Sequence, residues 1–308
     1  MQRVHFIGIG EPDLSALAIA VSKKNNFTVT GSDCYVAAEQ AAALKNAGIL
    51  PDDNGWFPEK IKHQLTAVVL GYNVKADNPE YIKAKESGLK IFSFAEYFFH
   101  QTRSKTRIVV AGQDEKPLIT AMMLHVLKLL KIEVDYAFLS GKAPYGERVR
   151  LTYDSRIALF EMDESLISPV KGKLEFCAYK PHIVVFDNSV LNNVVDKQVF
   201  YEDKKDKYRC FLDTIEVQGR LIYSALNNDI GEITEKLRRD IVSFAYDHPD
   251  VELTDGQVRI KTRKHEIETL LKPAQLPAVQ AAYLACKQIG VSEEQFYSQI
   301  AGFESNEG

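Results

Sequence analysis

Short β-prone runs alternate with helix-like stretches along the N-terminal part of the chain, and this alternation constrains the fold most strongly. The β-prone runs are Val4–Ile9, Thr28–Gly31, Ala67–Leu70 and Lys90–Phe92. The stretches between them are helix-like, most clearly at Leu14–Lys24, Glu39–Ala47 and Tyr81–Ser87. Strands that alternate with helices form parallel sheets, because each helix carries the chain back to the edge from which the strand started. We therefore expect an α/β fold that opens with a Rossmann-like domain.

A second pattern of the same kind follows a polar connection at Gln101–Thr106. It opens with a buried-strand pattern, Arg107–Ala111, which leads through Gly112 into a helical stretch from Pro117 to Leu130. Further β-prone runs come later, at Ile157–Phe160, Ile183–Phe186 and Arg220–Ser224. A chain of 308 residues is long enough for about two domains. We expect a Rossmann-like domain at residues 1–104 and a second α/β domain at residues 105–308.

The composition excludes several classes of function. The formal net charge is −4 and basic residues are interspersed with acids, so the chain lacks the positive surface that a nucleic-acid partner requires. The four cysteines lie far apart without a CxxC or Cys/His spacing, which favours reduced thiols over a disulfide scaffold or a zinc site. The sequence has neither a signal-peptide pattern nor an apolar run of about 18 residues. We therefore expect a cytoplasmic protein without a nucleic-acid or membrane partner.

The first β-prone run ends in a glycine loop, Gly8-Ile9-Gly10, before a helix. Such loops let backbone amides approach a diphosphate at the positive end of the helix. The full fingerprint has a third glycine where this chain has Asp13, with Glu11 standing between. Two interpretations stay open. In the first, the acids exclude a diphosphate, because each would repel a unit of phosphate charge by roughly 3 kcal/mol at about 5 Å and an effective dielectric near 20. In the second, Asp13 is an N-cap and both acids stabilise the helix start.

The second β-prone run ends at Ser32-Asp33. A carboxylate at this place commonly accepts a hydrogen bond from a ribose hydroxyl. The sugar end of a nucleotide site can therefore survive independently of its phosphate end.

Several ordered segments resemble the Mur ligase family. VHFIGIG and VTGSD lie within Val4–Asp33, LGYNVKADNPE is Leu70–Glu80, and IVVAGQDEKPLITAMMLHVL is Ile108–Leu127. The resemblance continues through Phe160–Glu164 and Tyr179–Ile183. Within the family it points to the ligases that attach L-alanine, or in recycling a tripeptide, to UDP-N-acetylmuramate.

The resemblance implies a three-domain, ATP-dependent ligase of peptidoglycan synthesis or recycling. In this family ATP phosphorylates the muramoyl carboxylate, and an amine then attacks the acyl phosphate. By this resemblance, the sugar nucleotide would be bound by Gly8, Gly10, Ser32, Asp33 and Asn73. ATP and its Mg²⁺ would be bound by Gly112, Lys116 and Glu161, of which Lys116 and Glu161 are also the catalytic candidates. The chain stops after Gln295–Phe303, about where the amine-binding domain would begin, so we expect the C-terminal ligase domain to be absent.

Three elements of the implied ATP site depart from the family pattern. The family's phosphate loop reads approximately AGTHGKTT, whereas Ala111–Leu118 reads AGQDEKPL. Glu115 replaces the glycine that lets the loop wrap phosphate, and Pro117 replaces the hydroxyl that ligates Mg²⁺ and also lacks an N–H donor. The family's Asp-His pair is replaced by Asn192-Asn193, and its later His-Asn pair by Leu276-Pro277.

These combined changes predict a degenerate ATP site and a catalytically inactive relative. Such a protein would act by binding a UDP-N-acetylmuramate-type sugar nucleotide, another cell-wall intermediate or a protein partner, and would need no cofactor. Two alternatives remain. The chain is an active ligase whose unusual site still takes ATP and Mg²⁺ through Lys116 and Glu161, or it is an interaction partner of a true Mur ligase.

Overall fold

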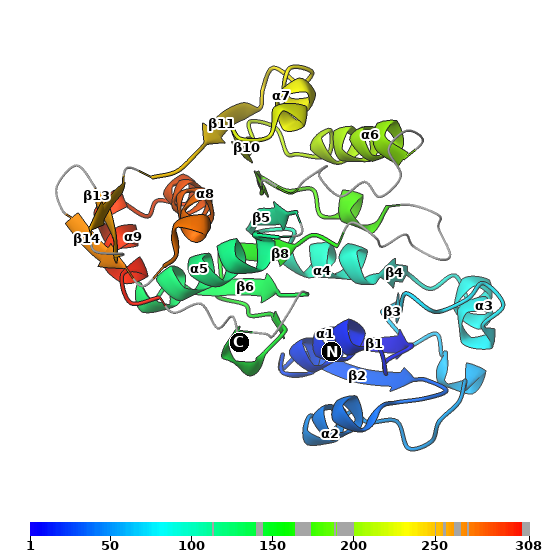
Figure 1. Cartoon of the computed structure of the whole chain (residues 1–308). Coiled ribbons are helices and arrows are strands. Elements are labelled where there is room, and N and C mark those ends of the chain that lie inside the picture. Colours follow the sequence, from blue (N-terminus) through cyan, green and yellow to red (C-terminus); the bar gives the residue numbers. More distant parts are fainter. Residues whose placement is uncertain are drawn as a thin grey trace.

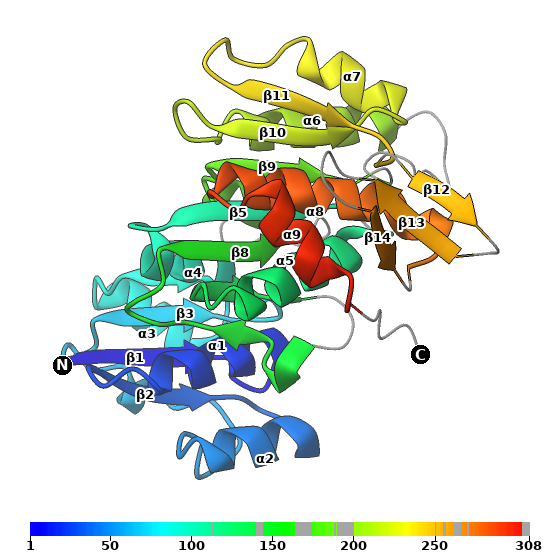
Figure 2. The same cartoon turned by 90° about the vertical axis from the view of Figure 1, so that its left-hand side faces the viewer.

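Two mainly parallel sheets and one small antiparallel sheet make up the architecture (Figure 1). The computed structural model describes residues 1–112, 114–139, 144–163, 174–187, 189, 200–249, 251–254, 257–261, 266–269 and 271–303. The two larger sheets follow one another from β2 at the bottom to β11 at the top of Figure 2, with helices on their faces. Within these described ranges, no helix is long and apolar enough to cross a membrane.

The first sheet confirms the Rossmann-like expectation, because all of its strands pair in parallel in the order β2-β1-β3-β4. Its strands are β1 (Gln2–Ile7), β2 (Phe27–Ser32), β3 (Ala67–Leu70) and β4 (Ile91–Ser93). Its helices are α1 (Pro12–Ser22), α2 (Ala38–Asn46), α3 (Pro79–Glu86) and α4 (Phe94–Thr102), with the 3-10 turn η1 (Pro58–Lys60). The chain places β2 on one side of β1 and β3 on the other, so the strand succession reverses between β1 and β3.

The second sheet has the order β11-β10-β9-β5-β8-β6-β7, with β7 antiparallel to β6 and the other described pairs parallel. Its strands are β5 (Thr106–Ala111), β6 (Val134–Ala137), β7 (Val149–Arg150), β8 (Ile157–Glu161), β9 (Ile183–Phe186), β10 (Arg220–Ser224) and β11 (Val242–Tyr246). The helices after β5 are α5 (Lys116–Leu129), α6 (Phe200–Leu212), α7 (Asn228–Thr234), α8 (Leu276–Gln288) and α9 (Glu293–Ile300). The 3-10 turns are η2 (Pro144–Gly146), η3 (Glu175–Ala178) and η4 (Pro273–Gln275).

A three-stranded antiparallel sheet, which the sequence pattern did not predict, lies beside α9. Its strands are β12 (Val251–Thr254), β13 (Gln257–Lys261) and β14 (Glu266–Thr269). In β13, Val258 and Ile260 are buried while Arg259 and Lys261 alternate with them. A sheet covered on one face shows this alternation instead of the continuous apolar run that marks a strand buried on both faces.

The strands of the second sheet are buried on both faces, and each face has its own core. Along β5, Val109 and Ala111 belong to one buried cluster, and Ile108 and Val110 to the other. Helices α5, α8 and α9 cover the second of these faces. This two-faced burial explains why Arg107–Ala111 reads as a nearly continuous apolar run.

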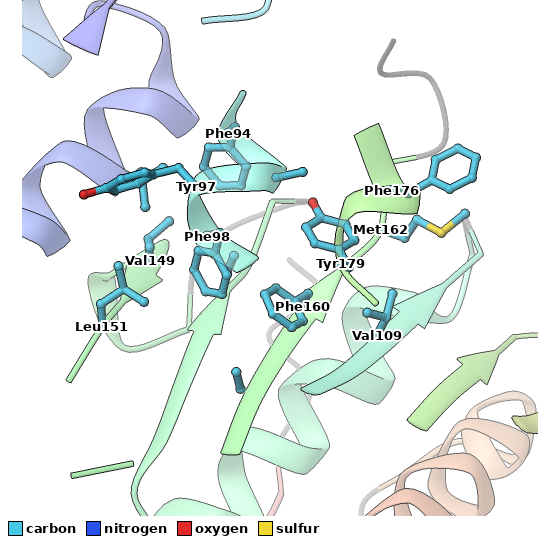
Figure 3. Packing of buried hydrophobic residues seen from close by; sticks show 14 of the residues in the cluster. Phe94, Tyr97, Phe98, Val109, Val149, Leu151, Phe160, Met162, Phe176 and Tyr179 are labelled. Carbon is cyan, nitrogen blue, oxygen red and sulfur yellow. The ribbon is translucent and has the colours of Figure 1, made fainter. Parts of the chain in front are cut away.

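Helix α4 connects the two larger sheets through a shared core (Figure 3). A capping box between Ser93 and Glu96 fixes the start of this helix. Tyr97 packs edge-on against Phe6 of β1, with ring centroids 6.1 Å apart, and Phe98 packs edge-on against Phe160 of β8 at 4.6 Å. One continuous cluster of buried residues therefore runs from the first sheet into the second.

Candidate functional site

Each larger sheet has one place where a ligand is expected on topological grounds. In open α/β sheets, ligands bind beyond the carboxyl ends of the strands where the strand succession reverses. In the first sheet this place lies between β1 and β3, at Gly8–Glu11 and Gly71–Asn73, and we call it the first switch point. In the second sheet it lies between β5 and β9, at Gly112, residues 114–116, Asp187 and Ser189, and we call it the second switch point.

Every N–H group of the loop from Gly8 to Glu11 donates a hydrogen bond within the chain. The amides of residues 8 and 9 donate to the Ser32 carbonyl oxygen, with N–O distances of 2.8 and 3.2 Å. The Gly10 amide donates to Asp33 Oδ2 at 2.9 Å, and the Glu11 amide donates to the Gly8 carbonyl at 3.1 Å. The structure thus brings Gly8, Gly10 and Asp33 together, and the Asp33 carboxylate is engaged by the loop itself.

The Glu11 side chain spans the first switch point. Its Oε2 accepts a hydrogen bond from the Tyr72 amide at 2.7 Å, and its Oε1 accepts one from the Asn73 amide at 2.8 Å. A Cβ atom on Gly71 would lie 2.6 Å from Glu11 Oε1, so a larger residue there would displace the Glu11 carboxylate. Asn73, which the resemblance assigned to the sugar nucleotide, lies at the first switch point, and its amide donates to the Glu11 carboxylate.

Asp13 does not cap α1, contrary to one of the two sequence-based interpretations. Pro12 occupies the first helical position, so Glu11 is the N-cap residue, and its side chain makes no capping hydrogen bond. The Asp13 carboxylate instead pairs with Arg148, whose guanidinium nitrogens lie 2.8 and 3.2 Å from Oδ1. Arg148 precedes β7 of the second sheet, so this ion pair joins the two sheets.

Ser32 lies in a buried polar network at the end of β2. Its hydroxyl donates to Glu80 Oε2, and His5 Nε2 lies 3.2 Å from the Ser32 oxygen and 3.3 Å from the same carboxylate oxygen. The Phe57 amide donates to Glu80 Oε1 at 2.5 Å. Ser32, His5 and Glu80 are fully buried, so the Ser32 side chain links the end of β2 to α3 within the interior.

The second switch point is spanned by the Asp187 carboxylate. Its Oδ2 accepts hydrogen bonds from the amides of Glu115 at 3.0 Å and Lys116 at 2.9 Å, at the start of α5. Its Oδ1 accepts from the Ser189 amide and hydroxyl, at 2.8 and 2.6 Å. The Ser189 hydroxyl oxygen accepts in turn from the Asp114 amide at 3.0 Å. Asp187 and Ser189 therefore take three backbone amides of the loop and helix start that follow β5.

Gly112 leaves room for this carboxylate. Its φ angle is 127°, in a region that favours glycine, and a Cβ atom there would lie 1.9 Å from Asp187 Oδ1. The glycine that the sequence assigned to ATP thus packs against an aspartate of the same chain.

Lys116 and Glu161 both lie at the carboxyl-end edge of the second sheet, since Lys116 begins α5 after β5 and Glu161 is the last residue of β8. Lys116 Nζ donates to the Met162 carbonyl oxygen at 2.6 Å, and Glu161 Oε2 accepts from the Leu139 amide at 2.9 Å. Glu161 is fully buried. Both side chains are therefore bound to backbone groups of the second sheet.

Two other changed elements have different positions. Asn192 and Asn193 lie outside the described residues, whereas Leu276 begins α8 and is buried with Pro277 in the core beneath the second sheet. Among the described residues, no group of three or more His, Cys, Asp or Glu side chains is arranged to hold a metal ion.

Burial acts on the pKa of the acids at and near both switch points. It raises the pKa of the Glu11 and Asp187 carboxyls, and the backbone hydrogen bonds that they accept oppose this shift without cancelling it. Burial also raises the pKa of Asp13, against the attraction of Arg148. Burial raises the pKa of Glu80 as well, but hydrogen bonds from His5, Ser32 and the Phe57 amide outweigh it and lower the pKa overall.

Sequence reasoning missed Asp187 and Arg148. The available signal for Asp187 was its position directly after the apolar run of β9, since polar residues that follow buried parallel strands gather at one edge of the sheet. Arg148 gave no comparable signal, because its partner Asp13 lies 135 residues earlier in the chain.

Comparison with known proteins agrees with the motifs and the fold. A family model described as Mur ligase family, catalytic domain, matches residues 3–105. A UDP-N-acetylmuramate–L-alanine ligase from Levilactobacillus brevis is 29% identical over 252 residues, which cover 80% of this chain and 50% of that ligase. The ligase of the same name from Persephonella marina is 27% identical over 303 residues, covering 96% of this chain and 62% of that ligase. The chain is a relative of the Mur ligases.

Solved structures show the same fold in this Mur ligase relative. The UDP-N-acetylmuramate:L-alanyl-gamma-D-glutamyl-meso-diaminopimelate ligase from Neisseria meningitides superposes with a TM-score of 0.81 at 16% identity, covering 99% of this chain and 98% of that one. A UDP-N-acetylmuramate-alanine ligase from Thermotoga maritima gives 0.69 at 18% identity, covering 98% and 69%. The two larger sheets have the folds of Mur ligase N-terminal and central domains. The chain spans about half the length of the curated relatives that it matches.

Proposed function

We propose that this Mur ligase relative neither binds nor hydrolyses ATP and that it acts by binding a cell-wall intermediate or a protein partner. The observation that carries the proposal is the Asp187 carboxylate, which accepts hydrogen bonds from the Glu115 and Lys116 amides at the start of α5. In a phosphate loop, amides at this place cradle the phosphates of the nucleotide. The chain's own carboxylate takes the place of that anion.

A triphosphate would have to compete with Asp187 for the same donors. At about 5 Å and an effective dielectric near 20, the carboxylate opposes each unit of phosphate charge by roughly 3 kcal/mol, about a hundredfold in affinity. Moving the side chain away would break its hydrogen bonds to the Ser189 amide and hydroxyl as well. The competition therefore favours the closed arrangement.

The remaining residues of the implied site support the same conclusion. Lys116 Nζ is bound to the Met162 carbonyl, and one oxygen of Glu161 is bound to the Leu139 amide. Pro117 offers Mg²⁺ no hydroxyl. The donors at the second switch point do not fit MgATP, so no phosphoryl transfer is assigned to this chain.

The proposed ligand carries a muramoyl group, because the names of the relatives specify UDP-N-acetylmuramate. For this chain we assign ligand binding to a domain at residues 1–104, and a supporting role to a domain at residues 105–308. A protein partner, including a true Mur ligase, is the second candidate, because a scaffold with a closed nucleotide site can still present its surface. Both roles are consistent with a cytoplasmic protein.

The decisive experiment is calorimetric titration of the protein with ATP in the presence of Mg²⁺. We expect no binding up to millimolar ATP, because the loop amides are occupied by Asp187. The Asp187→Ala variant opens these amides and is expected to gain weak ATP affinity, whereas Asp154→Ala, which removes an exposed acid before β8, is the matched control. Submillimolar ATP binding by the unmodified chain, or ATP turnover with UDP-N-acetylmuramate, would refute the proposal.

A further inference from the structure

The first switch point carries a feature that the ATP site does not explain. Glu11 leaves the glycine loop after β1, crosses to the loop after β3 and binds two consecutive amides there, those of Tyr72 and Asn73. Consecutive backbone N–H groups that point to one place form an anion-binding concavity. This concavity lies where strand succession reverses, which is where an α/β sheet of this topology receives a ligand.

An external anion would find these donors taken. The amides of Tyr72 and Asn73 are bound by Glu11, the Gly10 amide is bound by Asp33, and the amides of residues 8, 9 and 11 donate to carbonyl oxygens of the chain. Two carboxylates, Glu11 and Asp33, already accept hydrogen bonds from the amides of these loops. A diphosphate would add further negative charge to this pair and would have no loop amide to neutralise it.

We propose that the Glu11 carboxylate occupies the place of a ligand's diphosphate. The first switch point therefore prefers ligands that lack a nucleotide diphosphate to sugar nucleotides. Glu11 thereby determines specificity by the charge that it places in the site. The ligand class is a muramoyl sugar or muramoyl peptide without its nucleotide, and this choice of sugar rests on the proposed function. The exclusion of diphosphate rests only on the contacts of Glu11.

The test compares UDP and inorganic pyrophosphate as probes in calorimetric titrations of the unmodified protein and of Glu11→Ala. We expect the unmodified protein to bind neither probe at millimolar concentration. Removal of the Glu11 carboxylate frees the Tyr72 and Asn73 amides, so the variant should gain at least tenfold in affinity for both probes. Glu86→Ala removes an exposed acid at the far end of α3 and should gain nothing.

A second arm compares N-acetylmuramate with UDP-N-acetylmuramate in the same proteins. The unmodified protein should prefer the nucleotide-free sugar, and Glu11→Ala should reverse the order. If Glu11→Ala does not fold, Glu11→Gln replaces it, because the amide keeps the side-chain volume and removes the charge; a smaller gain for UDP is then expected.

Two results would overturn the inference. One is submillimolar binding of UDP or UDP-N-acetylmuramate by the unmodified protein, and the other is a folded Glu11 variant that gains no affinity for UDP or pyrophosphate. ATP is titrated in parallel, because ATP binding by the unmodified protein would refute the closed second switch point and leave the first untouched. The two proposals can therefore fail separately.

Discussion

At both switch points a carboxylate of the chain binds backbone amides, yet the two acids reach across in opposite directions. Glu11 belongs to the loop after β1 and binds the loop after β3, whereas Asp187 follows β9 and binds the start of α5. Asp187 is fully buried, while Glu11 is only partly buried. An anion site between two strands can thus be filled from either loop, so a glycine motif alone does not reveal whether the site is open.

Because Asp187 is more deeply buried than Glu11, we expect it to bind its backbone amides more firmly. Asp187 also binds the amide and hydroxyl of Ser189, so its withdrawal would leave several buried groups without partners. Glu11 holds the Tyr72 and Asn73 amides from a position that solvent reaches, and water can replace it. The second switch point is therefore the more firmly closed of the two.

The largest effect is expected when the packing between the two sheets is disrupted. Replacing Phe98 by Ala removes the ring that packs on Phe160, and we expect a loss of about 3–5 kcal/mol in the free energy of unfolding. Urea unfolding followed by circular dichroism measures it, with Ile82→Ala, a change at a side chain that is 41% exposed, as the control. Two separate unfolding transitions in the unmodified chain would show that the sheets do not share one core.

The next test compares the two acids directly. We expect Asp187→Ala to lower the free energy of unfolding by about 1–3 kcal/mol, because buried amides lose their acceptor, and Glu11→Ala to lower it by less than about 1 kcal/mol. Both are measured by urea unfolding at neutral pH. An equal loss for the two variants would contradict the difference in closure.

A smaller effect is expected at the ion pair that joins the sheets beside the first switch point. A double-mutant cycle of Asp13→Ala and Arg148→Ala should give a coupling of about 0.5–1 kcal/mol, because both side chains are mostly buried and two guanidinium nitrogens donate to Asp13 Oδ1. The Lys23–Glu147 pair joins the same two regions with side chains 56% and 39% exposed, so its cycle should give less. A larger coupling for Lys23–Glu147 would argue against a bridging role for Asp13.

The smallest effect concerns pH and has opposite signs for two acids. The raised pKa of Asp187 means that the folded chain binds its proton more tightly than the unfolded chain, so stability relative to Asp187→Asn should fall as pH rises above the ordinary value of 3.8. The lowered pKa of Glu80 stabilises the fold above the ordinary value of 4.5, and this gain over Glu80→Gln is lost as pH falls through the folded pKa. Urea midpoints recorded from acidic to neutral pH should show these opposite slopes, and slopes of equal sign would exclude the assignment.

The four strands of the first sheet, and β5, β8, β9 and β10 of the second, could be predicted from the sequence because their signal is local, whereas β6, β7 and β11 were not predicted. Ala67–Leu70 and Ile183–Phe186 are continuous apolar runs with exact strand bounds, since both faces of these strands are buried. The antiparallel sheet was not predicted, because one solvated face interrupts its apolar pattern. The assignment of Gly112, Lys116 and Glu161 to an ATP site came from the family resemblance and stays a prediction, and the structure places these residues at the ends of β5 and β8.

The side chains that bind the loop amides at the two switch points could not be predicted, because these contacts join residues that are distant in the sequence. The charge of Glu11 was recognised, but its partners lie 61 and 62 residues further along the chain. Asp187 binds amides 71 and 72 residues earlier. The N-cap assignment of Asp13 was wrong because Pro12 fixes Glu11 as the residue before the helix, which leaves Asp13 free to pair with Arg148.

Helix α4 has a consequence for the thermodynamics of recognition. Because its aromatic side chains belong to the core of both sheets, the sheets cannot rotate about it without exposing Phe98 and Phe160 to water. A ligand that binds at the first sheet contacts a surface whose position relative to the second sheet is fixed by folding. The free energy of binding should therefore include little unfavourable conformational change between the two sheets. The association rate should depend on diffusion and charge instead of on a conformational step.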